Sequence, residues 1–300
     1  MDGILPLYKP NGMTSHDCVD KVRKLTRQRR IGHTGTLDPG AEGVLPLCLG
    51  KATKVVQYMA EDEKEYEAEI TLGMATTTED RDGEVISEKP VERPLERKEM
   101  IAALEKWTGP VEQVPPMYSA VKVKGKRLYE YAREGLEIER PKRQVRIYEL
   151  KLLDSHETFH GEFPVFRVRV RCSKGTYIRT LAVNIGQELG YPAHMSALLR
   201  TISGNFSLAD CLTLEQIEKM VEKRELEDQL FPIDKAISSL PKMTVNESVE
   251  AKVRNGAVLP LPSGMAEKTF TVYNEEGHLL AVYEEHPAKP GLMKPQKVFS

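Results

Sequence analysis

The hydrophobic positions of this chain alternate in two well-separated segments, which predicts half-buried β-strands there. Over residues 64–73 the even positions from Tyr66 onward are apolar, and glutamates stand at 65, 67 and 69. Residues 165–172 repeat the alternation with arginines at 167, 169 and 171. Because successive side chains of a strand point to opposite faces, each segment presents one apolar and one charged face. Short apolar runs at 4–8 and 44–49 predict two further strands.

Apolar residues recur at helical spacing in several other segments. Thr14, followed by Asp17 three residues later, matches a capping box at the start of a helix. A second helix is predicted to stop at Gly109 and Pro110, which are helix-ending residues. The predicted helices beyond the one after Thr14 cover residues 52–59, 95–107, 128–133, 176–189 and 214–223.

The pattern changes from about residue 240 onward, where short β-like runs are punctuated by glycine and proline. The clearest runs are residues 258–261, 269–273 and 279–283. We therefore predict two domains, residues 1–238 and a small all-β domain at residues 239–300, a size that can just fold alone. The fold class expected for the larger part is α/β (α+β), with a central sheet and helices on its flanks.

The composition is that of an ordinary globular protein. The chain has 300 residues, 40% hydrophobic and 29% charged, and no apolar run approaches the roughly eighteen residues of a spanning helix. Its start, MDGILPLYKP, does not resemble a signal peptide. The four cysteines lie far apart, which argues against a disulfide framework or a structural zinc site and favours a reducing, cytoplasmic location.

Basic residues cluster in spite of a net charge of −2. Six of the ten residues at 21–30 are Lys or Arg, more than a helix dipole needs at its C-terminus, which favours contact with phosphate. Further clusters lie at 122–127, 140–146 and 167–171. For the arginines at 167–171, a solvated strand face and an RNA-contacting face are equally good interpretations.

A glycine-rich loop precedes the strand at 44–49 and carries one acid, Asp38, between Leu37 and Pro39. Residues before proline avoid the α region, and the surrounding glycines allow the chain to double back. A carboxylate on such a loop, anchored by a buried strand, is a candidate for chemistry. Asp, Pro and Gly are also common turn residues, so an idle turn is the alternative.

Residues 156–160, HETFH, match the zinc-protease motif H-E-x-x-H. That chemistry needs a helix, because only there do histidines four apart share a face. Here Gly161 and Pro164 follow directly between two strand-like runs. We predict a β-hairpin loop with two exposed histidines, and no metal site.

The loop at residues 32–54, GHTGTLDPGAEGVLPLCLGKATK, closely resembles the signature of the bacterial TruB-type tRNA pseudouridine synthases. Four other blocks resemble that family in the same order: LPLYKPNGMTSHD, KEYEAEITLG, VPPMYSAVKVKGKRLYEYAREG and CSKGTYIRTLAVNIGQELG. The resemblance implies a mixed, mostly antiparallel sheet and a PUA-like RNA-binding C-terminal domain. It further implies isomerisation of uridine 55 in the T-loop of tRNA, with no cofactor and no metal.

The resemblance also implies roles for individual residues. Asp38 matches the catalytic nucleophile, Tyr66 the tyrosine that stacks on the target base, and Arg179 the arginine that pairs with the carboxylate. The substrate-binding positions of the family match His33, Tyr177, Leu198 and Lys9, the last with Pro10 supporting the site. The expected partner is the T-arm of tRNA. The protein is expected to bind it as a monomer and not to associate with a membrane. The alternative is a non-catalytic RNA-binding protein or tRNA chaperone.

Overall fold

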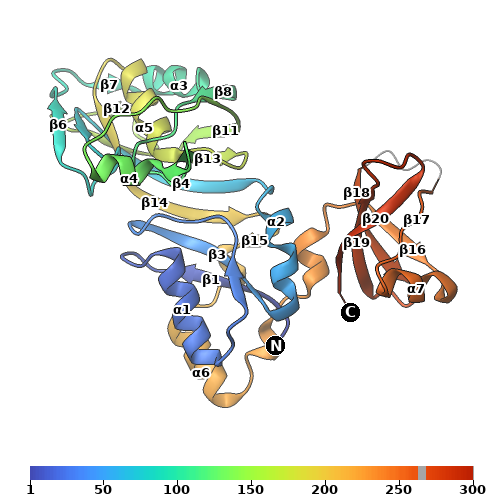
Figure 1. Cartoon of the computed structure of the whole chain (residues 1–300). Helices are drawn as coiled ribbons and strands as arrows, with labels where there is room; N and C mark the ends of the chain where they lie inside the picture. The colour runs from blue at the N-terminus through green and yellow to red at the C-terminus, as the bar shows by residue number, and fades with distance from the viewer. Residues whose placement is uncertain (263–267, 300) are drawn as a thin grey trace.

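The computed structural model describes residues 1–262 and 268–299. A large mixed sheet forms the centre of the molecule, and a smaller sheet at the C-terminal end of the chain lies to one side of it (Figure 1). The main path of the large sheet runs in the order β1 (Gly3–Lys9), β3 (Ala41–Leu49), β14 (Ala193–Ser203), β4 (Lys64–Leu72), β13 (Val165–Cys172), β11 (Arg143–Leu152) and β8 (Gly109–Gln113). Two short strands branch from it: β2 (Ile31–His33) pairs with β3, and β15 (Phe206–Ser207) with β14.

The pairing in the large sheet is antiparallel except between β14 and β3. That parallel pairing aligns Leu198 with Ala41 and Arg200 with Gly43. Gly43 has a φ of +104°, and a Cβ there would lie 2.2 Å from the carbonyl oxygen of Arg200. Only glycine therefore allows the two backbones to approach this closely. The expected mixed, mostly antiparallel sheet is confirmed.

Helices cover the sheet in two groups. α3 (Arg97–Glu105) and α5 (Ile178–Glu188) pack on β4, β11 and β13, whose apolar faces form the largest core cluster. α1 (Ser15–Thr26) and α6 (Leu214–Lys223) pack together on β1 and β3. The opposite face of those two strands meets a 3₁₀ segment, Gly50–Val55, which leads into α2 (Val56–Met59). Three more 3₁₀ turns are Leu208–Asp210, Glu227–Gln229 and Ile233–Ile237.

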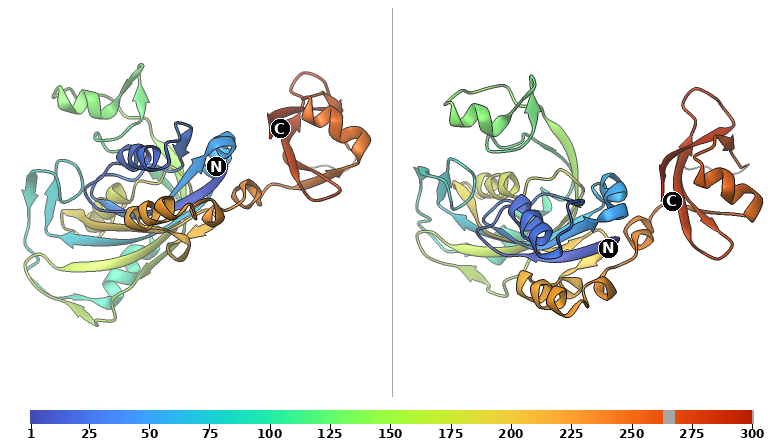
Figure 2. Two further views of the ribbon diagram at one scale, coloured as in Figure 1. Left: turned by 90° about the horizontal axis from the view of Figure 1, so that it is seen from below. Right: turned by 60° about the horizontal axis from the view of Figure 1, so that its bottom comes forward.

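A separate set of short elements projects from the body of the molecule, drawn in green in Figure 2. It consists of the hairpin β9 (Lys122–Val123) and β10 (Lys126–Arg127), followed by α4 (Leu128–Arg133). The remaining small strands of the larger part are β5 (Met74–Thr76), which pairs with β6 (Val85–Glu88), and β7 (Leu95–Glu96), which pairs with β12 (Thr158–Phe159).

The C-terminal sheet has the order β16 (Lys242–Val245), β18 (Thr269–Asn274), β19 (Leu279–Glu285), β20 (Leu292–Val298) and β17 (Leu259–Pro260). It contacts the larger part near α2, where Tyr58 donates to Gln296 at 2.6 Å. The expectation of an all-β unit is wrong in one respect, because α7 (Glu247–Arg254) packs on this sheet. Asn246 caps α7 by accepting the backbone N–H of Val249. Asparagine is a preferred N-cap residue, so the sequence itself indicated the start of this helix.

Most predicted elements are present, with some shifted boundaries. The capping box of α1 is confirmed, since Thr14 and Asp17 each accept the other's backbone N–H. The helix expected at 95–107 begins only at Arg97, because residues 95–96 pair with β12. The helix expected at 52–59 is 3₁₀ as far as Val55. The segment HETFH contributes the two residues of β12 and no helix, and both its histidines are exposed as predicted.

Candidate active site

The glycine-rich loop is fixed by buried polar contacts from the N-terminal elements. Lys9, at the end of β1, is fully buried, and its Nζ donates to the carbonyl oxygens of Pro10, Pro39 and Ala41 at 2.6–3.1 Å. Ser15 of α1 bonds both the N–H and the C=O of Leu37. The residues on either side of Asp38 are therefore held in place. The ammonium group of Lys9 thus faces the carbonyls that hold the loop, and a contact of Lys9 with substrate stays a prediction.

Asp38 forms an ion pair with Arg179, which α5 brings to the loop. The Nη2 of Arg179 lies 3.0 Å from Oδ2 of Asp38, and Nη1 lies 3.4 Å from Oδ2 of Asp80. The same guanidinium donates to the carbonyl oxygens of Thr78 and Tyr118 at 2.9 and 3.0 Å. Its side chain is only 6% exposed, whereas that of Asp38 is 47% exposed. Four acceptors thus fix the buried guanidinium of Arg179. The Asp38 carboxylate that pairs with it stays partly exposed.

Opposing influences act on the Asp38 carboxyl group. Burial raises the pKa of Asp38 above its ordinary value, and the nearby charge of Asp80 adds to the rise. Arg179 is the strongest influence in the other direction, and Lys9 acts in the same sense. The two cations therefore offset part of the rise in the pKa of Asp38 that burial causes, and so favour its anionic form.

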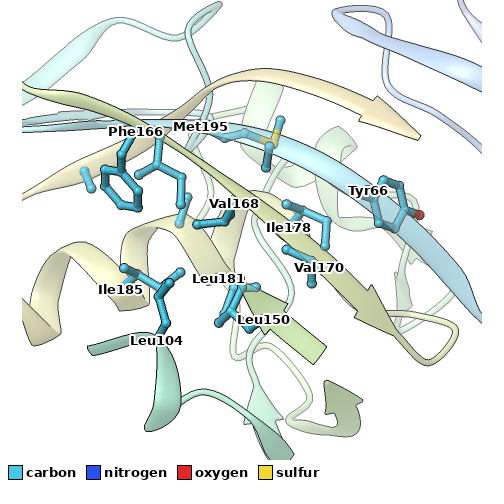
Figure 3. Close-up of a cluster of buried hydrophobic side chains, with 14 of the residues drawn as sticks. Tyr66, Leu104, Leu150, Phe166, Val168, Val170, Ile178, Leu181, Ile185 and Met195 are labelled. Carbon is cyan, nitrogen blue, oxygen red and sulfur yellow. The ribbon is translucent and has the colours of Figure 1, made fainter. Parts of the chain in front are cut away.

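A cavity of about 270 Å³ opens beside this pair. Asp38, Arg179, Tyr66, Tyr177 and Leu198 all line it, so the structure brings together five of the seven residues singled out from the sequence. Tyr66 is 9% exposed and lies at one end of the main apolar cluster, with its hydroxyl pointing away from the other labelled side chains (Figure 3). Two tyrosine side chains, an aliphatic side chain and a carboxylate therefore line a common space that is large enough for a nucleobase.

Gln113, at the end of β8, fixes the start of α5 and with it one wall of the cavity. It accepts the backbone N–H of Tyr177 at 3.0 Å and donates to the carbonyl oxygen of the same residue at 3.2 Å. The side chain of Gln113 is buried. The position of Tyr177 is thus tied to the far edge of the sheet.

His33 lies outside this cavity, at the end of β2, where it pairs with Leu47 of β3. Burial lowers the pKa of His33, and its Nδ1 has no hydrogen-bond partner among the described residues. A contact of His33 with substrate stays a prediction.

Four charged residues of the site were not singled out from the sequence, and one of them, Lys174, lines the cavity with a half-exposed side chain. Asp80 lies in a polar loop after β5 and is the second counter-ion of Arg179. Lys64 of β4 and Arg200 of β14 line the same cavity, although both are almost fully buried. The signal available for Arg200 was a lone arginine in the apolar run AHMSALLR, and for Asp80 it was the dense acidic turn TEDRDG.

The arginines at 167, 169 and 171 do not face the cavity, and they pair with acids. Arg169 lies 3.0 Å from Glu67, Arg171 3.1 Å from Glu63, and Arg167 3.3 Å from Asp154. Of the two interpretations of this face, the structure favours a solvated ladder of ion pairs. The basic residues at 21–30 behave differently, since only Arg23 among them forms an ion pair in the described residues, with Asp20.

Two other classes of site find no support in the described residues. Within residues 1–262 and 268–299, no three His, Cys, Asp or Glu side chains are grouped to hold a metal ion. No helix in the same residues is long and apolar enough to cross a membrane.

The sequence of this chain matches two family models and is similar over its full length to named proteins. Residues 23–178 match the N-terminal domain of the TruB family of pseudouridylate synthases, and residues 179–238 match the C-terminal domain of tRNA pseudouridylate synthase B. A protein of Geobacillus thermodenitrificans named tRNA pseudouridine synthase B is 56% identical over 301 residues, covering 100% of both chains. A protein of the same name from Bacillus cytotoxicus is 53% identical, covering 99% of this chain and 97% of its own.

The fold is also similar to that of chains in solved complexes. The chain superposes on one from a Cbf5-Nop10-Gar1 complex with a TM-score of 0.75 and 30% identity, covering 99% of this chain and 85% of that one. A chain of an H/ACA RNP bound to a substrate RNA containing 2′-deoxyuridine gives a TM-score of 0.73, 27% identity and the same coverage. The family matches and the full-length relatives, together with this fold and cavity, identify the chain as a member of the TruB family of pseudouridylate synthases.

Proposed function

We propose that this chain converts uridine 55 in the T-loop of tRNA to pseudouridine, with Asp38 as the nucleophile. The full-length relatives carry the name tRNA pseudouridine synthase B, which supports tRNA as the substrate. The observation that carries the proposal is the pairing of Asp38 with the buried Arg179 at the mouth of a cavity that Tyr66 also lines.

The reaction is an isomerisation and consumes no co-reactant. The bond between ribose C1′ and uracil N1 breaks, a bond between C1′ and C5 forms, the C5 proton leaves and N1 takes up a proton. Asp38 attacks the nucleotide at ribose C1′ or base C6, and must be ionised to do so. Arg179 orients the carboxylate and opposes the rise in its pKa that burial causes.

The target base must leave its stack to reach Asp38, so the nucleotide is flipped into the cavity. Tyr66 then stacks on the base and offsets part of the unstacking, by roughly 1–3 kcal/mol for a base–aromatic pair. Leu198 and Tyr177 complete the walls of the same cavity. We further assign His33 a contact with the substrate RNA outside the cavity.

The exposed basic residues hold the T-arm by its phosphates. The segment at 21–30 and the projecting hairpin with α4 supply them, so binding weakens as salt rises. We assign residues 239–300 to a PUA-like domain that adds RNA contacts, with residues 1–238 as the catalytic domain. The protein acts as a monomer, in the cytoplasm where its substrate is.

A tritium-release assay on tRNA labelled at uridine C5 tests the proposal, because C5 loses its hydrogen in this reaction. We expect Asp38→Asn to lower the rate by at least about 10⁴-fold, the scale seen when a nucleophile is removed. Its affinity for tRNA should stay close to that of the wild type, because Asn keeps the shape and the loop contacts.

Uridine and pseudouridine are isomers of equal mass, so the positional control is treatment of the product with a carbodiimide that stays attached to pseudouridine, followed by primer extension across the T-arm. Conversion must be confined to position 55. Substantial turnover by Asp38→Asn would exclude Asp38 as the nucleophile. Binding without any conversion by the wild type would favour the RNA-chaperone alternative instead.

A further inference from the structure

Lys64 and Arg200 are two buried cations that line the cavity beside Asp38, and neither forms an ion pair with a carboxylate in residues 1–262 and 268–299. Lys64 is 6% exposed and Arg200 is 1% exposed. The ion pairs among the described residues include Arg179 and Lys174 of this cavity, but not these two. Buried charges are normally paired, so an unpaired couple inside a cavity needs an explanation.

Backbone carbonyls hold both cations without neutralising them. Lys64 Nζ donates to the carbonyl oxygens of Ala60 and Asp62 at 3.0 and 2.5 Å. Arg200 donates from Nε to Val44 and from Nη2 to Gly35, both at 2.7 Å. These bonds use only part of the N–H groups of an ammonium and a guanidinium, so both retain donors for a ligand.

The two side chains converge on one point of the glycine-rich loop. A Cβ added to Gly35 would lie 3.1 Å from Nη1 of Arg200 and 3.6 Å from Cε of Lys64. Burial lowers the pKa of Lys64, and the charge of Arg200 lowers it further, although Asp62 opposes the shift. An anion between the two cations would relieve that repulsion.

Their position relative to Tyr66 indicates which part of a flipped nucleotide they meet. Arg200 pairs with Tyr66 across β14 and β4, and Lys64 lies two residues before Tyr66 on the same face of β4. The ribose and its phosphates continue into the RNA strand and must stay near the cavity mouth. The base is the free end of the nucleotide, so it reaches the buried groups.

We propose that Lys64 and Arg200 form an oxyanion subsite that binds a carbonyl oxygen of the uracil ring and stabilises the negative charge it gains during the reaction. The inference rests on the proposed function. It assigns both residues direct contact with the reacting base, in addition to their backbone bonds.

The charge arises whichever atom Asp38 attacks. If the C1′–N1 bond breaks first, its electron pair stays on the ring and spreads from N1 onto O2 and O4. If Asp38 adds to C6, the electrons of the C5–C6 double bond move to C5 and onto O4. In either case two fixed cations in a site of low dielectric stabilise the charged state more than the neutral base.

The test compares Lys64→Met with wild type in single-turnover assays on a T-arm stem-loop. We expect a rate loss of about 100-fold, the size of effect of one lost oxyanion donor, with an unchanged dissociation constant for the RNA. Lys64→Arg, which keeps the charge, should recover much of the rate and serves as the second variant if Lys64→Met does not fold.

The matched control is Lys151→Met, which removes an exposed lysine of β11 that does not line the cavity. The Lys151 side chain is 64% exposed and pairs with Glu149 at 2.9 Å. We expect its rate to stay within about threefold of wild type, because exposed pairs contribute little.

A stem-loop with 5-fluorouridine at the target position separates charge stabilisation from a structural role. Fluorine withdraws electrons, so the ring carries negative charge with less help from the protein. The rate lost on Lys64→Met, measured as disappearance of the N-glycoside, should be several-fold smaller with 5-fluorouridine than with uridine.

Equal losses on the two substrates, or a Lys64→Met rate near that of wild type, would overturn the inference. Weaker binding with an unchanged rate would do so as well, and would assign the pair to a backbone phosphate. These outcomes differ from failure of the proposed function, in which the wild type itself would leave uridine unconverted.

Discussion

Arginine–carboxylate pairs lie on both faces of the sheet around β4 and β13, and their geometry is nearly the same. Arg179 lies 3.0 Å from Asp38 on the cavity side, and Arg169 lies 3.0 Å from Glu67 on the other side. Their surroundings differ, since the Arg179 side chain is 6% exposed and that of Arg169 is 41% exposed. Distance alone therefore does not separate a functional pair from a solvated one, whereas burial of the arginine does.

The physical reason is the cost of removing charge from water. An exposed pair gains little, because water and salt screen both partners. A buried guanidinium must be fully satisfied by acceptors, and Arg179 has two carboxylates and two carbonyls around it. Such a network holds one arrangement rigidly, as the proposed role of Asp38 as nucleophile requires.

The strongest test of this difference is to remove the buried arginine. We expect Arg179→Met to lower the rate of pseudouridine formation by about 10²–10³-fold, because Asp38 loses its orienting cation and its pKa rises further. Loss of one partner of a buried pair should also destabilise the fold by about 3 kcal/mol. Single-turnover kinetics and chemical denaturation measure the two effects, and a variant as active as wild type would contradict the comparison.

Asp80→Asn is expected to have a smaller effect on the rate and to shift the pH dependence of the rate in a defined direction. The active carboxylate form of Asp38 is lost as pH falls through its pKa, which is raised, so the rate should fall at a higher pH than for an ordinary aspartate. Asp80 contributes to that rise. Its neutralisation should therefore move the acid limb of the pH–rate profile to lower pH.

At neutral pH we expect this variant to be slower by roughly tenfold, because one of the two carboxylates that orient Arg179 has lost its charge. A limb that stays in place or moves to higher pH would show that Asp80 does not act on Asp38 through charge.

The smallest effect is expected on the other face. Arg171→Met breaks the ion pair with Glu63, in which the Arg171 side chain is 46% exposed and the Glu63 side chain is 48% exposed. Stability should change by at most about 0.5 kcal/mol, and the single-turnover rate should equal that of wild type. A large loss of RNA affinity here would instead favour the RNA-contacting interpretation of this strand face.

Much of the fold could be predicted because local patterns decide it. The alternation in β4 and β13 and the capping box of α1 depend on residues close in sequence, and each is present in the structure. The strand β14 was not predicted, although it lies in the middle of the sheet. Its pairing with β4 has irregularities after Met195 and after Arg200, which break the period of two.

The site was only partly predictable for a related reason. Asp38 and Arg179 were found through a family resemblance, which transfers residues from motif to motif. Asp80, Lys64 and Arg200 act through contacts between distant segments, and no local pattern marks a charged residue that a strand will bury. The all-β expectation for the C-terminal unit failed at α7 because its flanking strands dominated the pattern.

The parallel pairing of β3 with β14 has a consequence for how the protein is made. It joins residues 41–43, which follow the loop that carries Asp38, to residues 198–200, so these two parts of the site emerge from the ribosome far apart in time. Contacts of such sequence separation form late and slow folding. Until residues 193–203 are synthesised, β3 and β4 each expose an unpaired edge, which invites association with other chains. Insertion of β14 between β3 and β4 therefore both covers these edges and brings Leu198 and Arg200 to the cavity.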